Sequence, residues 1–180
     1  DILFGKVSPS GKLPITFYKG LEGLPEFTDY SMKNRTYRYM SQEPLYPFGY
    51  GLSYGDVQVE EAKVSGAVTR ESDIPVEISL KNQGQMDTDE VVQVYIKDLD
   101  SDLAVPNYSL CGFERVSLKA GEKKTVEVTV PNTAMSVVDE EGERHIDSRN
   151  FKLFVGFSQP DARSLKLTGK EPAEISVVLQ

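Results

Sequence analysis

The sequence predicts an all-β protein: an antiparallel β-sandwich of the immunoglobulin type in residues 56–180, preceded by an irregular wrapping segment in residues 1–55. Three observations lead to this prediction. From Val57 onward, apolar residues recur at every second position, as in strands that bury one face. Turn-forming residues separate these runs. No segment between them is suited to a helical crossover, which excludes parallel βαβ units, and about seven such strands indicate two packed antiparallel sheets.

The first 55 residues are short extended runs broken by Pro and Gly. Pro9-Ser10-Gly11 is a turn, and Leu13–Tyr18 is a short extended run that its Pro confines to a sheet edge or to the start of a strand. Leu24–Phe27 and Glu43–Pro47 contain Pro as well and behave as extended or loop segments. No stretch here sustains a helix of three turns, so we expect a segment that wraps over a neighbour and is not an independent domain.

Five runs of the sandwich show the alternation clearly, and two are less regular. The clear apolar faces are Ile74, Val76, Ile78 and Leu80; Val92, Val94 and Ile96; Val126, Val128 and Val130; Phe151, Leu153, Val155 and Phe157; and Ile175, Val177 and Leu179. The less regular runs are Val57–Val64 and Leu110–Leu118. Turns are expected at 82–84, 119–122 and 139–142, where Gly and polar residues cluster.

Composition limits the classes of partner. The net charge is −8 and the basic residues are scattered, which argues against nucleic acid or an anionic membrane as the main partner. Cys111 is the only cysteine, so no internal disulfide is expected, and both a cytoplasmic and a secreted location stay open. The chain begins without Met or a signal peptide, and we expect it to be a piece of a longer polypeptide.

Specific strings of residues occur at Phe4–Pro14, Arg35–Tyr39 and Glu43–Tyr54. They resemble glycoside hydrolase family 3, the family of many β-glucosidases. The first string is similar to the stretch that closes the second, α/β-sandwich domain of that family. Arg35–Tyr39 and Glu43–Tyr54 resemble the junction that leads into its fibronectin type III-like domain, and the second of these strings, EPLYPFGYGLSY, is long and specific. Glu90–Ile96 and Leu110–Val116 continue the resemblance into the sandwich.

Two departures from the family pattern concern turns. Asn34 stands where Gly is common before Arg35, and Asn also tolerates a positive φ, so the turn is expected to survive. Ser148-Arg149-Asn150 replaces a Glu-Pro-Gly before the last strand pair, which changes the expected turn but not the fold.

The resemblance implies a non-catalytic accessory module of a retaining glycosidase. Retention needs two carboxyl groups only about 5 Å apart. The family takes its Asp nucleophile from a TIM barrel and its acid/base carboxylate usually from the α/β domain. The nucleophile motif does not occur in this chain, and the acid/base segment lies upstream of residue 4 in the usual domain order, so neither catalytic residue is carried over. The implied partners are these two domains of the same polypeptide and, through them, a β-linked oligosaccharide. The implied parent is a β-glucosidase, with β-xylosidase as runner-up, and the order of its domains stays open.

Other chemistry-bearing residues favour structural readings. Asp139–Glu143 is expected to be a solvated polar turn. Asp98–Asp102 resembles the start of a calcium loop, but Leu103 stands where the sharp-turn Gly belongs. His145 is the only histidine and is expected at the surface or at a strand edge, and Cys111 is expected to be a buried structural thiol. We therefore expect no catalytic residue, no metal site and no cofactor in this chain.

An aromatic cluster in the head is the main candidate site. Six rings fall within eighteen residues: Tyr37, Tyr39, Tyr46, Phe48, Tyr50 and Tyr54. Aromatic faces pack against both sugars and protein, so the candidates for interdomain or sugar contact are Arg35, Tyr37, Tyr39, Tyr46, Phe48 and Tyr50. The interpretation we favour is packing onto the sandwich and onto an absent domain, with some rings exposed in isolation.

Two alternative functions remain at this point. One is a carbohydrate-binding sandwich, for which Tyr95 and Tyr108 are the available tyrosines of an exposed platform in the sandwich part. The other is a free-standing adhesion-type module, which the head disfavours because it resembles the end of another domain.

Overall fold

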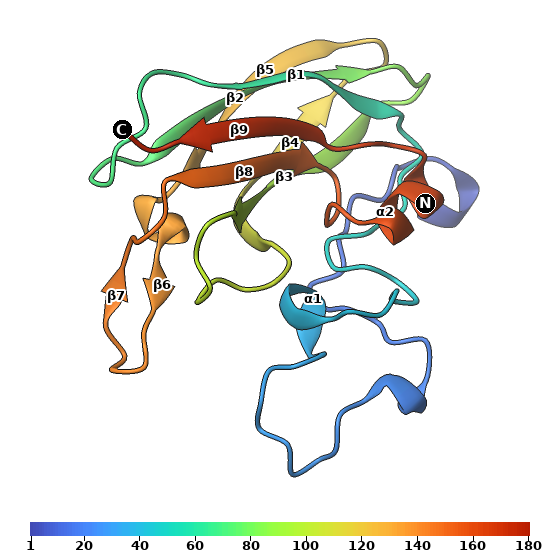
Figure 1. Cartoon of the computed structure of the whole chain (residues 1–180). Coiled ribbons are helices and arrows are strands. Elements are labelled where there is room, and N and C mark those ends of the chain that lie inside the picture. The colour runs from blue at the N-terminus through green and yellow to red at the C-terminus, as the bar shows by residue number, and fades with distance from the viewer.

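The computed structural model describes all 180 residues and contains two antiparallel sheets packed face to face (Figure 1). The first sheet has the order β1 (Val57–Val64), β2 (Ile74–Asn82), β5 (Lys123–Val130). The second has the order β4 (Ser109–Leu118), β3 (Thr88–Asp98), β8 (Asn150–Gly156), β9 (Ala173–Val178). A small separate hairpin joins β6 (Val137–Val138) to β7 (Arg144–His145). The predicted β-sandwich is confirmed.

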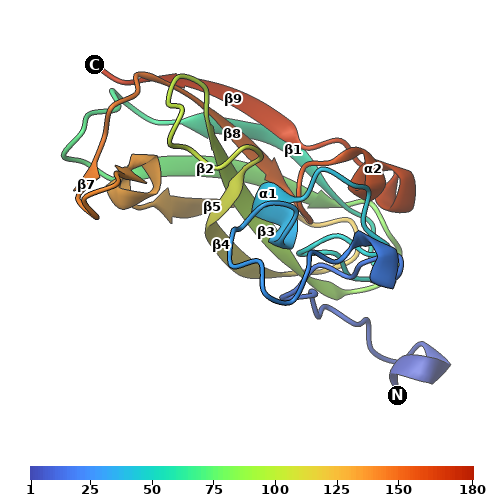
Figure 2. The ribbon, with the colours of Figure 1, turned by 60° about the horizontal axis from the view of Figure 1, so that its bottom comes forward.

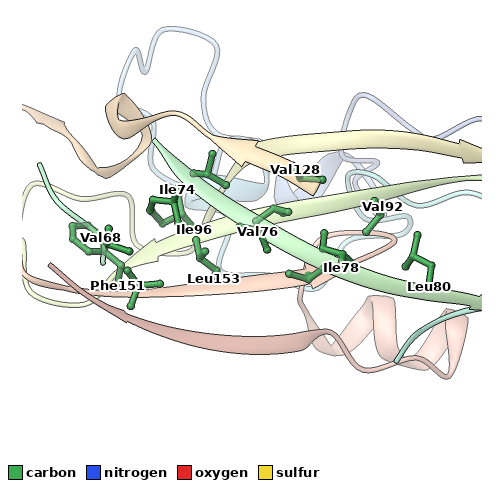
Figure 3. Close-up of a cluster of buried hydrophobic side chains, with 14 of the residues drawn as sticks. Val68, Ile74, Val76, Ile78, Leu80, Val92, Ile96, Val128, Phe151 and Leu153 are labelled. Atoms are coloured by element: carbon green, nitrogen blue, oxygen red, sulfur yellow. The ribbon is translucent and has the colours of Figure 1, made fainter. Parts of the chain in front are cut away.

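The core lies between the two sheets and follows from the alternation in the sequence. In β2, every second residue from Ile74 to Leu80 is buried, while Pro75, Glu77 and Ser79 between them are only partly buried. Figure 3 shows these side chains meeting Val92 and Ile96 of β3 and Phe151 and Leu153 of β8. Burial of a Val, Ile or Leu side chain stabilises the fold by about 1.5–3 kcal/mol. The alternating faces therefore supply most of the driving force for the sandwich.

The strand β3 is buried on both faces over its second half. Val92, Val94 and Ile96 belong to the core, whereas Gln93 and Tyr95 are buried on the opposite face. That opposite face is covered by the head, here defined as residues 1–54. The sandwich therefore has a second, smaller interior beneath the head.

The head contains little regular structure: η1 (Ile2–Phe4), η2 (Leu21–Gly23) and the single-turn helix α1 (Thr36–Tyr39). Its run Leu13–Phe17 pairs with residues 45–50 through four backbone hydrogen bonds of 2.8–3.0 Å. Figure 2 shows η1 at the end of an extended stretch that leads away from the sandwich. Asn34 adopts φ 58°, as expected for the residue that replaces Gly there.

Two short helices of the sandwich part were not predicted. η3 (Asn132–Met135) follows β5, and α2 (Ala162–Thr168) lies between β8 and β9. In α2, the Asp161 side chain accepts a hydrogen bond from the Ser164 N–H, and Gly169 ends the helix at φ 67°. These are standard N-cap and C-cap features. No helix of the structure is long and apolar enough to cross a membrane.

Cys111 lies in β4 against the core, and its thiol donates to the carbonyl of Val94. Burial raises the pKa of the Cys111 thiol to about 12, because the thiolate would lose its hydration. Compared with the ordinary pKa of 9.0, the thiolate population at neutral pH is lower on the order of a thousandfold. We expect a disulfide reagent to label the native chain far more slowly than the chain in guanidinium, at a rate that rises with pH. Equal rates in both states would show that β4 opens freely.

Candidate functional site

The head is fixed to the outer face of β3 through the amide of Gln93. The Gln93 Nε2 donates to the carbonyl of Gly49 at 3.0 Å and to that of Phe157 at 2.9 Å, while its Oε1 accepts the Tyr95 hydroxyl at 2.6 Å. Gly49 has φ 76°, and a Cβ there would collide with Gln93 and Tyr95. The glycine in the string PFGYG therefore allows the head backbone to approach the sheet closely.

Aromatic rings fill the space between the head and the sheet. Tyr37 stacks on Phe48 with a centroid distance of 4.4 Å, and both rings meet Tyr95 edge-on. The Tyr37 hydroxyl accepts the N–H of Leu110 at 2.9 Å. Tyr95, one of the two tyrosines available to the alternative of a carbohydrate-binding sandwich, offers no exposed platform, because it is fully buried in this cluster and Tyr108 packs against it. Alternation alone places Tyr95 outward and does not reveal the cover.

The other candidate residues divide between internal and exposed positions. Tyr50 is buried and stacks parallel to Tyr46 at 5.9 Å, while Tyr46 stays exposed. Tyr39 is half-buried. Arg35 directs its guanidinium to three backbone carbonyls of the loop before α1, at Glu26, Asp29 and Ser31. Tyr46 and Tyr39 therefore keep exposed ring surface, whereas Arg35 organises the head itself.

A charged clamp joins the head to α2. The Glu43 carboxylate accepts Lys166 at 2.6 Å and Lys19 at 2.8 Å, and Arg163 donates to the carbonyl of Leu45. The hydrogen bonds from Lys166 and then from Lys19 lower the pKa of the Glu43 carboxyl to about 2. These contacts were not predicted, because α2 was not predicted.

We expect Glu43→Gln to be less stable than the native chain at pH 7. The folded-state pKa of about 2 lies below the ordinary 4.5, so the contribution of Glu43 is fully present above pH 4.5. It is lost as the pH falls through the folded pKa, so the difference between the two chains shrinks toward pH 2. Urea unfolding at several pH values measures the difference in unfolding free energy between the two chains. A difference that does not change with pH would show that packing, and not the charge of Glu43, causes the loss of stability.

The outer surface of the head is unusually apolar for an exposed surface. Of the twenty-one large hydrophobic side chains that are exposed, fifteen lie in residues 1–54. They include Phe4, Phe27, Tyr30 and Leu52. A groove of about 760 Å³ opens in the same surface between Pro14–Tyr18 and the α1 region, lined mostly by apolar side chains. Apolar patches of this kind mark surfaces that contact another molecule or domain.

None of the shifted carboxyl pKa values in this chain is shifted in the direction that a general acid requires. A general acid needs a raised pKa, yet every carboxyl pKa that is shifted in this chain is shifted downward. The acidic turn of the β6–β7 hairpin is largely exposed, with His145 Nδ1 lying 3.5 Å from Asp139. In the loop after Asp98, the Asp100 carboxylate accepts hydrogen bonds from the N–H groups of Arg149 and Asn150 and so joins this loop to the start of β8. No group of three or more metal-ligating side chains is found.

Comparison with known proteins agrees with this geometry. The glycosyl hydrolase family 3 C-terminal domain matches residues 1–54, and the fibronectin type III-like domain matches residues 90–159. A xylan 1,4-β-xylosidase from Xylanibacter ruminicola is 41% identical over 93% of this chain and 19% of its own length. The thermostable β-glucosidase B of Acetivibrio thermocellus is 36% identical over 89% of this chain and 23% of its own length.

Solved structures give the same result. A family-3 β-glucosidase from Bifidobacterium adolescentis superposes with a TM-score of 0.83 at 29% identity, over 99% of this chain and 27% of that one. A β-sandwich carrying an apolar, tightly fixed head is thus one part of a class of multidomain proteins. The chain belongs to glycoside hydrolase family 3, of which it forms the C-terminal region with the fibronectin type III-like domain. It spans about a fifth to a quarter of the length of the relatives it matches.

Proposed function

We propose that the chain is the structural accessory module of a retaining family-3 glycosidase and has no turnover of its own. In this proposal, residues 1–55 complete a neighbouring α/β-sandwich domain, and residues 56–180 brace it against a TIM-barrel domain. The observation that carries the proposal is the concentration of exposed apolar side chains in residues 1–54. Surface of this kind is stabilised when a second domain covers it.

The substrate of the parent polypeptide is proposed to be a β-glucoside, with a β-xyloside as the second candidate. Relatives named for each activity match the chain, at 41% identity for a β-xylosidase and 36% for a β-glucosidase. Tyr39 and Tyr46 keep exposed ring surface and are the candidates for bordering the active-site entrance. A separate carbohydrate-binding role is disfavoured because Tyr95 is buried.

The test is hydrolysis of a panel of p-nitrophenyl β-glycosides by this chain and by the longer polypeptide that contains it. We expect activity only in the longer polypeptide, and the preferred glycoside identifies the sugar. Turnover by the isolated chain would overturn the accessory role. Specific, sugar-competable retention of the isolated chain on cellulose or xylan would instead support a binding module.

A further inference from the structure

The loop of residues 20–33, which includes η2 and precedes α1, projects away from both sheets (Figure 1). It carries two of the most exposed aromatic rings of the molecule, Phe27 at 93% and Tyr30 at 91% exposure. Leu21, Leu24 and Met32 of the same loop are exposed as well. The loop thus presents a continuous set of apolar side chains on an otherwise polar stretch of chain.

Hydrogen bonds hold this loop in one shape. The guanidinium of Arg35 reaches back to the loop, where Nη2 donates to the carbonyls of Asp29 at 2.6 Å and Glu26 at 3.3 Å, and Nε donates to that of Ser31 at 3.2 Å. The Asp29 carboxylate accepts the Ser31 N–H at 2.8 Å, a bond that lowers the pKa of Asp29. The Arg35 side chain therefore links backbone carbonyls on both sides of the loop tip through hydrogen bonds.

Hydrogen bonds also fix the base of the loop. The Tyr18 hydroxyl donates to the carbonyl of Asn34 at 3.0 Å, and the Asn34 Oδ1 accepts the Ser41 hydroxyl at 2.7 Å. Both Asn34 and Thr36 have positive φ, at 58° and 53°. A β-branched residue in this region is strained, and it persists only where the surrounding contacts enforce it. The backbone strain at Asn34 and Thr36 and the hydrogen bonds of the loop together indicate that the loop keeps one conformation.

We propose that this loop is a preorganised contact element, in which Phe27 and Tyr30 are the anchor residues and Arg35 is the positioning residue that holds them. The occupant is the remainder of the longer polypeptide. This inference rests on the proposed accessory function and names where the contact is made. A loop that is rigid before docking loses less conformational entropy on association, which strengthens the contact without adding area.

The chemistry of the loop favours a polypeptide over a sugar as its occupant. Leu21, Leu24 and Met32 flank the two rings, and aliphatic side chains of this kind pack against protein cores. The groove beside the loop is lined by eight hydrophobic residues of thirteen. Arg35 also lines this groove, but its Nε and Nη2 already donate to backbone carbonyls. The relatives extend far beyond the matched part, so their chains include the polypeptide needed to cover this surface.

The test is residue-resolved hydroxyl-radical footprinting of this chain and of the longer polypeptide that contains it. Because exposures of 93% and 91% would fall to those of an interface core, we expect the oxidation rates of Phe27 and Tyr30 to drop about tenfold in the longer polypeptide. Val178 in β9, which is 57% exposed and lies on the edge strand opposite β4, is the internal control and is expected to keep its rate. Each measurement is repeated with a β-linked disaccharide.

The role of Arg35 is tested with Arg35→Lys, which keeps the charge but loses the planar fork. In the isolated chain we expect faster amide exchange in residues 26–32 while the sandwich strands keep their protection. In the longer polypeptide we expect the protection of Phe27 and Tyr30 to weaken. The matched control is Arg38→Lys, because Arg38 lies in α1, the helix whose N-cap is Arg35, and is exposed. An Arg35→Lys chain with unchanged exchange and unchanged protection would overturn the positioning role.

The outcomes separate this inference from the proposed function. Protection of Phe4 and Leu52 without protection of Phe27 and Tyr30 would leave the accessory role standing and overturn the loop as its contact. Protection of none of the four residues would overturn both. Protection of Phe27 and Tyr30 that requires the disaccharide would make the occupant a sugar and overturn the polypeptide assignment.

Discussion

Replacing Gln93 by Met is expected to lower the free energy of unfolding by about 3–5 kcal/mol, because two buried partners and one partly buried partner lose their hydrogen bonds. The Gln93 side chain donates to the carbonyls of Gly49 and Phe157 and accepts from the hydroxyl of Tyr95, with donor–acceptor distances of 2.6–3.0 Å. Met fills nearly the same volume, so the change removes polar contacts and leaves little cavity. Urea unfolding followed by circular dichroism measures the effect.

A double-mutant cycle separates the orphaned hydroxyl from the orphaned carbonyls. Tyr95→Phe alone removes one hydrogen bond and is expected to cost about 1–2 kcal/mol. In the Gln93→Met background the same change removes an unpaired hydroxyl, so its cost is expected to vanish or to reverse sign. Gln83→Met, at an exposed turn position, is the control and should change stability by about 0.5 kcal/mol or less. A Gln93→Met effect as small as that of the control would mean that the head does not seal this interior.

The strands of the sandwich were predictable because one face of each is buried by neighbours that follow the same rule. The alternation from Ile74 to Leu80 and from Phe151 to Val155 sets both the strand type and the buried face. Period two holds wherever a sheet separates a core from solvent. The sequence accordingly predicted both sheets and the residues between them.

The interior beneath the head was not predictable by the same rule. Alternation assigns Gln93 and Tyr95 to the outer face of β3, and their burial depends on a cover supplied by residues 37–50, far away in the sequence. Local patterns carry no information on such a distant contact. The aromatic cluster indicates that the rings of the head pack onto the sandwich, and Gly49 marks a close approach of its backbone to the Gln93 and Tyr95 side chains, but neither signal specifies which residues become buried.

Arg35 and α2 show two further limits. Arg35, in the string that resembles the interdomain junction, was a candidate for interdomain or sugar contact, and the structure directs its guanidinium to loop carbonyls. Which acceptor a long side chain reaches depends on the path of the loop, and the sequence does not specify that path. The helix α2 had a readable signal, since Asp161 and Gly169 stand at its two ends. Its seven residues are too few to show helical periodicity.

Lys12→Met is expected to destabilise the chain by about 3–5 kcal/mol, since it leaves the carboxylate of Glu90 buried without its partner. The Lys12 Nζ lies 2.7 Å from Glu90 Oε1, and the two side chains are only 12% and 7% exposed. Lys12 belongs to the head and Glu90 to β3, so this pair couples the two parts of the molecule energetically. Thermal or urea unfolding measures the loss.

Two controls decide whether the buried charge is the cause. Lys63→Met breaks a pair with the same 2.7 Å separation from Glu77 but with both side chains about half exposed, and we expect it to cost far less stability than Lys12→Met, because solvent screens the exposed pair. Lys12→Met combined with Glu90→Gln removes the unpaired charge while keeping an acceptor for the Val91 N–H, so most of the stability should return. If Lys12→Met lowers the free energy of unfolding no more than Lys63→Met does, the ion pair does not couple the stability of the head to that of β3. If the double variant stays as unstable as Lys12→Met, the loss comes from the packing of the lysine stem and not from the charge.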